Sequence, residues 1–152
     1  MSSQAHEASG DSRSFTGGCA CGAVRYDIED AASGMGDCQC RQCQQRSGTG
    51  HGSYIAFASR DKVKLTGSLR EWDVTGDEGT VKRHAFCTVC GAPVSLTFPY
   101  GPGWFIIHAA SLDDPSQYQP QWVTYTRSGY AWDAVDPKLT KFERMPPRSD
   151  AE

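Results

Sequence analysis

The stretch that decides the fold is Cys38-Gln-Cys-Arg-Gln-Cys43, which places three thiols within six residues. A disulfide network rarely has such crowding, whereas zinc binds thiolates in loops spaced C-x-C and C-x-x-C. Three sulfurs leave one corner of a tetrahedron without a local ligand. A zinc site with three protein ligands and an open position can do chemistry, whereas a closed site with four ligands is usually structural.

Two further cysteine pairs, Cys19-Ala-Cys21 and Cys87-Thr-Val-Cys90, carry the other four thiols. Neither pair completes a tetrahedron alone, but together they supply four sulfur ligands. Gly22 and Gly91 directly follow the second cysteine of each pair, and glycine permits the tight turns that curl a chain around a metal ion. We expect the two pairs to meet and to bind zinc, whose binding energy then stabilises the fold. The alternative is a disulfide between Cys87 and Cys90, or buried thiols.

The three-cysteine stretch has alternatives of its own. A histidine, His51, His84 or His108, could close the site as a fourth zinc ligand, or the thiols could form a redox group without metal. In an open site, three thiolates make zinc a weaker Lewis acid than three histidines do, so ionising water is harder and exchange for another sulfur is easier. We therefore hypothesise that the site captures a thiol or a thiol adduct and favours its nucleophilic thiolate form.

Other polar residues near the three cysteines are candidates for binding and proton transfer. His51 lies in a glycine-rich loop close to them and is the candidate acid or base. Arg41 and Arg46 flank the same stretch and could each bind a substrate carboxylate through two parallel hydrogen bonds, or could be solvated. His84 and His108 fall in strand patterns, where a packed or surface histidine is expected rather than a catalyst. Four aromatic residues are expected in the core or in a pocket wall: Trp104, Trp122, Trp132 and Tyr130.

Composition limits the classes of protein that the chain can belong to. It has 152 residues, a net charge of −3, 38% apolar residues, 16 glycines and 8 prolines, which favours one domain built from short strands. Interleaved charges argue against a nucleic acid or an anionic membrane as partner. No apolar stretch approaches the roughly 18 residues of a transmembrane helix, and the N-terminus lacks the apolar middle of a signal peptide. We expect a cytoplasmic, reducing setting, where clustered cysteines are metal ligands or redox groups.

Short apolar stretches bounded by turn residues predict a mainly β fold, an all-β sandwich or folded sheet. We expect a disordered tail over 1–14, a domain over 15–147 and a C-terminal tail over 148–152. A turn is predicted at 16–22, a loop at 30–36 and a helical turn at 39–46. Gly67-Ser68 predicts a hairpin between two strands. The predicted strands are 23–28, 54–58, 63–66, 69–74, 81–86, 94–98, 104–109, 121–126 and 139–142.

Four motifs, taken in order, resemble a known family. They are Gly17-Gly-Cys-Ala-Cys-Gly-Ala-Val-Arg-Tyr26, the Cys-x-Cys-x-x-Cys stretch at 38–43, Phe86-Cys-Thr-Val-Cys-Gly-Ala-Pro93 and Ser111-Leu-Asp-Asp-Pro115. Seven cysteines at these spacings resemble the glutathione-dependent formaldehyde-activating enzyme family, which also includes centromere protein V. The resemblance runs from about Gly17 to Pro147. Directly after the third cysteine, where many members carry basic residues, this chain has Gln44-Gln45, and Arg46 follows.

The resemblance implies a single domain with an Mss4-like fold, in which zinc stabilises folded β-sheets. It implies two zinc ions per chain, a structural one on four cysteines and a catalytic one on three. It also implies a carbon–sulfur lyase that joins formaldehyde to glutathione as S-hydroxymethylglutathione, a step in formaldehyde detoxification. The structural ligands would be Cys19, Cys21, Cys87 and Cys90, and the catalytic ones Cys38, Cys40 and Cys43.

Taken together, the residues and the resemblance favour a zinc enzyme that acts on a thiol adduct of a small electrophile, with a thiol such as glutathione as its partner. One alternative is a zinc-binding module without activity that contacts a protein through an exposed sheet face. The other is a thiol redox sensor. A homodimer is an ordinary possibility for either an enzyme or a module.

Overall fold

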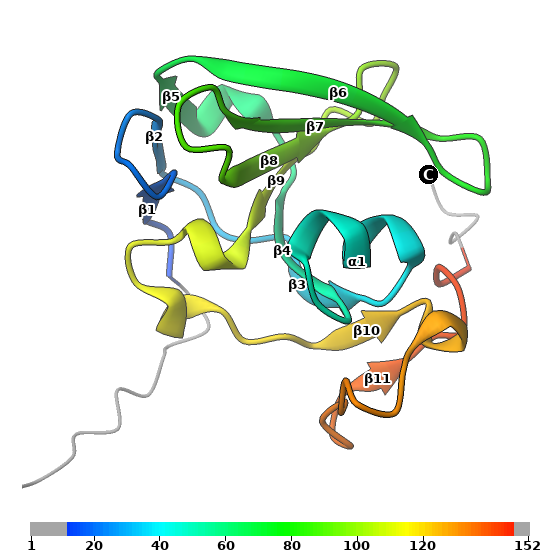
Figure 1. Cartoon of the computed structure of the whole chain (residues 1–152). Helices are drawn as coiled ribbons and strands as arrows, with labels where there is room; N and C mark the ends of the chain where they lie inside the picture. Colours follow the sequence, from blue (N-terminus) through cyan, green and yellow to red (C-terminus); the bar gives the residue numbers. More distant parts are fainter. Residues whose placement is uncertain (1–11, 148–152) are drawn as a thin grey trace, which may run out of the picture.

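A computed structural model describes residues 12–147 and shows two antiparallel or mixed β-sheets with one short helix (Figure 1). The smaller sheet has the strand order β1-β2-β5, and each neighbouring pair is antiparallel. Its strands are β1 (Phe15–Gly18), β2 (Arg25–Ile28) and β5 (Val63–Thr66). The mainly β fold class predicted from the sequence is confirmed. Of the tails predicted at 1–14 and 148–152, residues 1–11 and 148–152 lie outside the described residues.

The larger sheet has the strand order β11-β10-β3-β4-β9-β8-β7-β6. Strand β10 runs parallel to both of its neighbours, β3 and β11, whereas every other neighbouring pair is antiparallel. Its strands are β3 (Gly34–Cys38), β4 (Gly52–Phe57), β6 (Leu69–Thr75), β7 (Val81–Cys87), β8 (Pro93–Thr97), β9 (Phe105–His108), β10 (Trp122–Thr124) and β11 (Thr140–Lys141). The helices are α1 (Arg41–Ser47) and the 3₁₀ turns η1 (Arg60–Lys62), η2 (Ala109–Ser111), η3 (Pro115–Gln117) and η4 (Thr126–Ser128).

The apolar core lies between the two sheets. Phe15 of β1 packs edge-on against Phe57 of β4, with their ring centroids 5.2 Å apart. The small sheet contributes its inward residues at alternate positions of β2, as the half-buried strand pattern predicts. Complete burial of such a side chain contributes about 1.5–3 kcal/mol. The fully buried aliphatic side chains include Val24, Ile28, Ile55, Val94 and Ile107.

Helix α1 lies over the opposite face of the large sheet. Cross-strand partners share a face of a sheet, and the register pairs Tyr54 with His108, and His84 with both Leu96 and Trp72. These side chains form the surface on which α1 rests, as two contacts described below confirm. The large sheet therefore has a dry face that meets the small sheet and a second, more polar face that meets the helix.

Two segments predicted as loop or turn are strands. Residues 15–18 form β1, and 34–38 form β3, which was expected to be a loop because of its glycines. The glycines of β3 have a packing reason. The indole of Trp122, on the neighbouring strand β10, lies over Gly34 and Gly36, so that a Cβ atom at either position would sit within 2.3 Å of a ring atom. Glycine here makes room for a cross-strand aromatic side chain, a contact that the sequence pattern alone does not reveal.

The predicted hairpin around Gly67-Ser68 is wrong. Strand β5 pairs with β2 in the small sheet, while β6 pairs with β7 in the large one, so these two residues carry the chain from one sheet to the other. Gly67 has a φ of +100° and passes so close to the backbone of Ala23 that a Cβ atom would lie 2.2 Å from its carbonyl oxygen. Tertiary contact with the β1–β2 turn therefore sets this connection. The β6–β7 hairpin closes instead around residues 76–80.

Three of the four aromatic residues expected in the core or a pocket wall are exposed: Trp104, Tyr130 and Trp132 expose 46%, 45% and 67% of their surface. The prediction is wrong for Trp104 and Trp132, whereas Tyr130 lines a hollow beside α1. Trp132 stacks on Tyr130 with ring centroids 5.3 Å apart and nearly parallel planes. Both residues lie in the segment between β10 and β11. No helix among the described residues is long and apolar enough to span a bilayer.

Replacing Gly36 with alanine should destabilise the domain by about 1–3 kcal/mol, because the new methyl group would overlap the Trp122 indole. Urea unfolding of Gly36→Ala beside wild type measures this. The matched control is Gly103→Ala, since a Cβ atom at Gly103 meets no atom within 4 Å. Equal stability of the two variants would contradict the packing of Trp122 on β3.

Candidate metal centres

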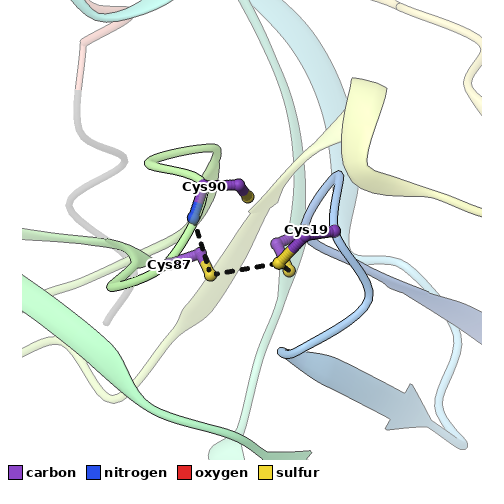
Figure 2. Close-up of side chains that lie close together, drawn as sticks. Cys19, Cys87 and Cys90 are labelled. Atoms are coloured by element: carbon purple, nitrogen blue, oxygen red, sulfur yellow. Dashed lines mark hydrogen bonds between the residues drawn. The ribbon is translucent and has the colours of Figure 1, made fainter.

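Two turns that are far apart in the sequence present the first cysteine group. Cys19 and Cys21 lie in the turn between β1 and β2, and Cys87 and Cys90 lie at the end of β7 and in the turn that follows it. In Figure 2 the labelled side chains of Cys19, Cys87 and Cys90 point toward one another from these two turns. The two turns therefore bring a pair of cysteines from the small sheet and a pair from the large sheet together, as the sequence predicts.

The two turns have the same construction. In each, the backbone N–H of the glycine after the second cysteine donates to the carbonyl of the first cysteine, Gly22 to Cys19 and Gly91 to Cys87. Both glycines have positive φ, +81° and +75°, a conformation that disfavours other residues. The predicted reason for these glycines is thus confirmed.

The sulfur atoms of this group fit a tetrahedral zinc ion. All four lie within 4.8 Å of one another, with 3.5 Å between Cys19 and Cys21 and 3.8 Å between Cys21 and Cys87. Zinc–sulfur bonds of about 2.3 Å in a tetrahedron require sulfur–sulfur edges of roughly 3.8 Å. These distances are too long for a disulfide bond, and all seven cysteines of the chain are free.

Backbone N–H groups aim at two of these sulfurs. The N–H of Val24 lies 3.2 Å from the Cys19 sulfur, and those of Val89 and Cys90 lie 3.3 and 3.5 Å from the Cys87 sulfur. The bond from Val24 is the largest cause that lowers the pKa of Cys19 to about 6. At Cys21 a backbone bond from Ala23, which lowers the pKa, is outweighed by the Cys19 sulfur and by burial, and the pKa rises to about 11. Cys19 is therefore ready to ionise and to bind a metal ion.

The second cysteine group lies where β3 passes into α1. Cys38 is the last residue of β3, Cys40 caps the N-terminus of α1, and Cys43 is in its first turn. The backbone N–H of Cys43 donates to the Cys40 sulfur over 3.4 Å. Their sulfur atoms also lie within 4.8 Å of one another. The strand end and the helical turn, which the sequence predicts at 39–46, together fold the C-x-C-x-x-C stretch into one group.

Hydrogen bonds among these three sulfurs distribute their charge unequally. Bonds from Cys38 and then from Cys43 hold the pKa of Cys40 well below its usual range, and the same contacts raise the pKa of Cys43. On the sheet side, the Tyr54 hydroxyl donates to the Cys43 sulfur over 3.1 Å. The pKa of Cys38 is raised as well, first by its contact with Cys40, so the negative charge of the group is concentrated on the Cys40 sulfur.

Within residues 12–147, no histidine, aspartate, glutamate or further cysteine offers a fourth ligand atom to this group. The three histidines considered as closing ligands, His51, His84 and His108, are not members of it. The donor set therefore fits a metal ion with three protein ligands and a further position for another molecule.

His51 lies directly before β4, one residue from Gly52, which pairs with Cys38. Its Nδ1 lies 2.9 Å from both carboxylate oxygens of Asp133, and its Nε2 lies 3.9 Å from Asp37. Gln39 donates a further hydrogen bond to Asp133. The candidate proton carrier thus lies between two carboxylates, with Asp133 at Nδ1 and Asp37 near Nε2.

The two candidate arginines lie on opposite sides of α1, and each lines a hollow. Arg46 lines a hollow of about 480 Å³ against β6 and β7, and its guanidinium carbon lies 5.3 Å from the Trp72 ring centroid and 5.7 Å from that of Phe86. Arg41 lines a hollow of about 350 Å³ against residues 127–130 and donates to the Gln44 side chain. Their positions alone do not show which of the two arginines would bind a substrate.

Sequence reasoning missed four residues that shape these sites: Tyr54, Trp72, Asp133 and Gln44. Gln44 is buried, and its amide donates to the carbonyls of Gln39 and Ser128, both at 2.9 Å. It therefore fastens η4 to α1. The position of Gln44 next to Cys43 was a signal of its importance. Tyr54 and Trp72 are instead brought in by strands β4 and β6, and Asp133 by the segment between β10 and β11.

His84 and His108 are buried and packed, as expected for histidines in strand patterns. Burial lowers the pKa of each to about 4, so both rings are neutral near pH 7. His84 Nδ1 and His108 Nε2 are buried and have no hydrogen-bond partner among the described residues. Unpaired buried nitrogens are costly, and these two lie in the layer between the sheet and α1.

The fold and the two cysteine groups define a class of small β protein, in which one thiol group joins two sheets and another lies beside a helix and a hollow. Comparison with known families gives the more specific assignment. The family described as glutathione-dependent formaldehyde-activating enzyme matches residues 14–128. The chain belongs to this family, and the resemblance noted from its motifs is confirmed.

One solved structure shares the fold. It is the crystal structure of a Rhodobacter sphaeroides protein, a structural genomics target, with a TM-score of 0.50 and 18% sequence identity. The match covers 84% of this chain and 98% of that one. At this identity the likeness concerns the fold alone.

Cys87→Ser and Cys40→Ser should have different effects on stability. Cys87 belongs to the group that joins the sheets, so its loss should lower the Tm by at least about 10 °C and reduce bound zinc from two ions per chain to one. Cys40→Ser should also bind one zinc ion but melt close to wild type. Thermal unfolding and metal analysis measure both effects.

Val89→Ser is the matched control, since Val89 lies in the same turn as Cys87 and is 75% exposed. If Cys87→Ser and Cys40→Ser melt alike, the division between a structural and a working group is wrong.

Proposed function

We propose that the chain is a zinc-dependent enzyme of the carbon–sulfur lyase type that acts on the adduct of a thiol with a small aldehyde, formaldehyde with glutathione in the family's named reaction. The observation that carries the proposal is the three-cysteine group, which lacks a fourth ligand atom among the described residues and lies beside a hollow. Family membership supports the reaction.

The reaction is an addition that balances without an oxidant or a reductant. A thiol loses its proton, its sulfur forms a bond to the aldehyde carbon, and the electron pair of the carbonyl π bond moves to oxygen. That oxygen then takes up a proton and becomes a hydroxyl group. Lyase activity is the same path reversed, in which the carbon–sulfur bond breaks and the hydroxyl proton leaves.

Cys38, Cys40 and Cys43 would hold the working zinc ion, and the other four cysteines the structural one. Bound zinc supplies a Lewis acid that favours the thiolate form of an incoming thiol. The Tyr54 hydroxyl, 3.1 Å from the Cys43 sulfur, reduces the charge on that ligand and fixes its direction. The spontaneous reaction of thiols with formaldehyde is easy, so the main task of the site is to position and ionise the sulfur.

His51 is our candidate for moving the proton. When the ring is neutral, a proton on Nδ1 that is donated to Asp133 leaves the lone pair on Nε2, the nitrogen that lies 3.9 Å from Asp37. In the proposed step Nε2 takes the thiol proton and returns it to the new hydroxyl oxygen. Asp133 acts as a positioning residue, because it fixes the tautomer in which Nε2 is the base.

A redox sensor is the second candidate, since three free sulfurs lie within 4.8 Å of one another. Two measurements distinguish it from the enzyme. Two zinc ions per chain in reduced protein favour the enzyme, whereas one zinc ion and a disulfide between Cys38 and Cys43 favour the sensor. The enzyme proposal includes a reducing compartment, in which free thiolates persist.

The zinc-loaded full chain should accelerate formation of the S-hydroxymethyl adduct from formaldehyde and glutathione. Exchange spectroscopy by NMR measures the forward and reverse rates at equilibrium. Cys40→Ser should return both rates to the spontaneous value, because it removes a ligand of the working group. Protein that holds two zinc ions and yet leaves both rates unchanged for glutathione and for smaller thiols would refute the proposal.

His51→Gln should lower the catalysed rate by about 100-fold, which is the lower range for loss of a general base, while zinc content stays at two ions per chain. The catalysed rate of this variant should no longer show the pH dependence that protonation of His51 gives to the wild type. Asp133→Asn should give a smaller loss and a shifted pH profile, since the imidazole remains. A pH profile identical to wild type in both variants would exclude His51 as the proton carrier.

A further inference from the structure

The larger hollow is a groove between α1 and the two outermost strands of the large sheet, β6 and β7. Its volume of about 480 Å³ lies within the range of sites that bind small molecules. Helix α1 contributes Gln42, Gln45 and Arg46, which share one side of the helix at spacings of three and four residues. The walls on the sheet side include Trp72 and Phe86.

Two aromatic rings hold the Arg46 side chain in a position from which its guanidinium group can bind an anion. Its guanidinium lies over both aromatic rings, at 5.3 Å from Trp72 and 5.7 Å from Phe86. Stacking occupies the faces of the planar group and leaves the N–H groups on its edge for a ligand. Among the described residues Arg46 and Arg70, which also lines the groove, make no ion pair. Glu71 lies at the same groove, and its carboxylate lies 3.7 Å from Arg83.

A second observation points to a ligand. His84 lines the groove, exposes 4% of its surface, and has a buried Nδ1 without a partner. The buried Oε1 of Gln42 likewise has no partner. An Oε1 acceptor requires a donor, which a bound molecule with an N–H or O–H group would supply. Two unsatisfied atoms beside two unpaired guanidinium groups are the pattern of a polar ligand site.

The groove lies next to the three-cysteine group. Gln42 is between Cys40 and Cys43 in the chain, and it lines the groove. His84, which also lines the groove, lies on the same face of the sheet as Tyr54, whose hydroxyl contacts the Cys43 sulfur. A molecule whose sulfur lies at the cysteines can therefore extend into the groove.

We propose that this groove selects thiols that carry a carboxylate, and that Arg46, rather than Arg41, is the residue that reads the carboxylate. The carboxylate binds the edge of the Arg46 guanidinium with Arg70 nearby, and the body of the thiol packs along Trp72 and Phe86. Cationic and neutral thiols lack this contact. The inference rests on the proposed function for its sulfur site. Glutathione, the thiol of that function, carries carboxylates, and the inference adds the residue that binds a carboxylate and the side of α1 on which it binds.

The test compares N-acetylcysteine with N-acetylcysteine amide, which differ in the carboxylate alone. Wild type should show a kcat/KM with formaldehyde that is about 10- to 100-fold higher for the acid than for the amide, as expected for a charge-assisted pair of hydrogen bonds. Arg46→Gln should lower kcat/KM for the acid toward that of the amide and leave the amide within about twofold. Arg41→Gln, on the other side of the helix, should keep the preference.

Arg70→Gln on the exposed edge strand is a second variant, in case Arg46→Gln does not fold, and it should weaken the preference. An equal kcat/KM for acid and amide in wild type overturns the inference, as does a preference that survives in both groove variants or is lost in Arg41→Gln. Calorimetric titration of zinc-loaded protein with the two thiols gives a readout that does not need turnover. If no thiol reacts but the acid alone binds and requires Arg46, the proposed function fails and the groove assignment stands. Absence of binding and of turnover overturns both.

Discussion

The meeting of four sulfurs from two turns is the constraint on which the rest of the molecule depends. Cys19 and Cys21 end the first hairpin of the small sheet, and Cys87 and Cys90 follow the strand β7 of the large sheet. The apolar core between the sheets is modest, and Cys19 and Cys87 are themselves part of it. A metal ion held at that junction would turn a loose pair of sheets into one rigid support.

The two faces of the large sheet have different roles: one stabilises the fold, and the other carries the residues of the candidate site. One face packs against the small sheet, and the other carries α1, the three-cysteine group and the groove. Tyr54 connects the layers, since its backbone lies in the central strand β4 and its hydroxyl reaches Cys43. A change in the helix layer can therefore alter chemistry without removing the contacts that stabilise the fold.

Local sequence signals predicted both cysteine groups, the glycines of the two turns, the helix and most strands, because each depends on a few neighbouring residues. Strand β3 could not be predicted in this way, since its glycines make sense only beneath Trp122, which lies far along the chain. The same holds for the β5–β6 connection, whose strands join different sheets. Arg46 was visible as a candidate, whereas its aromatic partner Trp72 came from a strand pairing that no local pattern encodes.

Gln44 has a consequence for where positive charge can stand on the helix. Its side-chain amide is enclosed and gives hydrogen-bond donors to two carbonyls, of Gln39 and Ser128. The ammonium group of a lysine at that position would lose its hydration shell on burial, which disfavours lysine there. A neutral amide therefore occupies the position next to Cys43, and the nearest charge that follows it on α1, that of Arg46, lies on the other side of the helix over the groove.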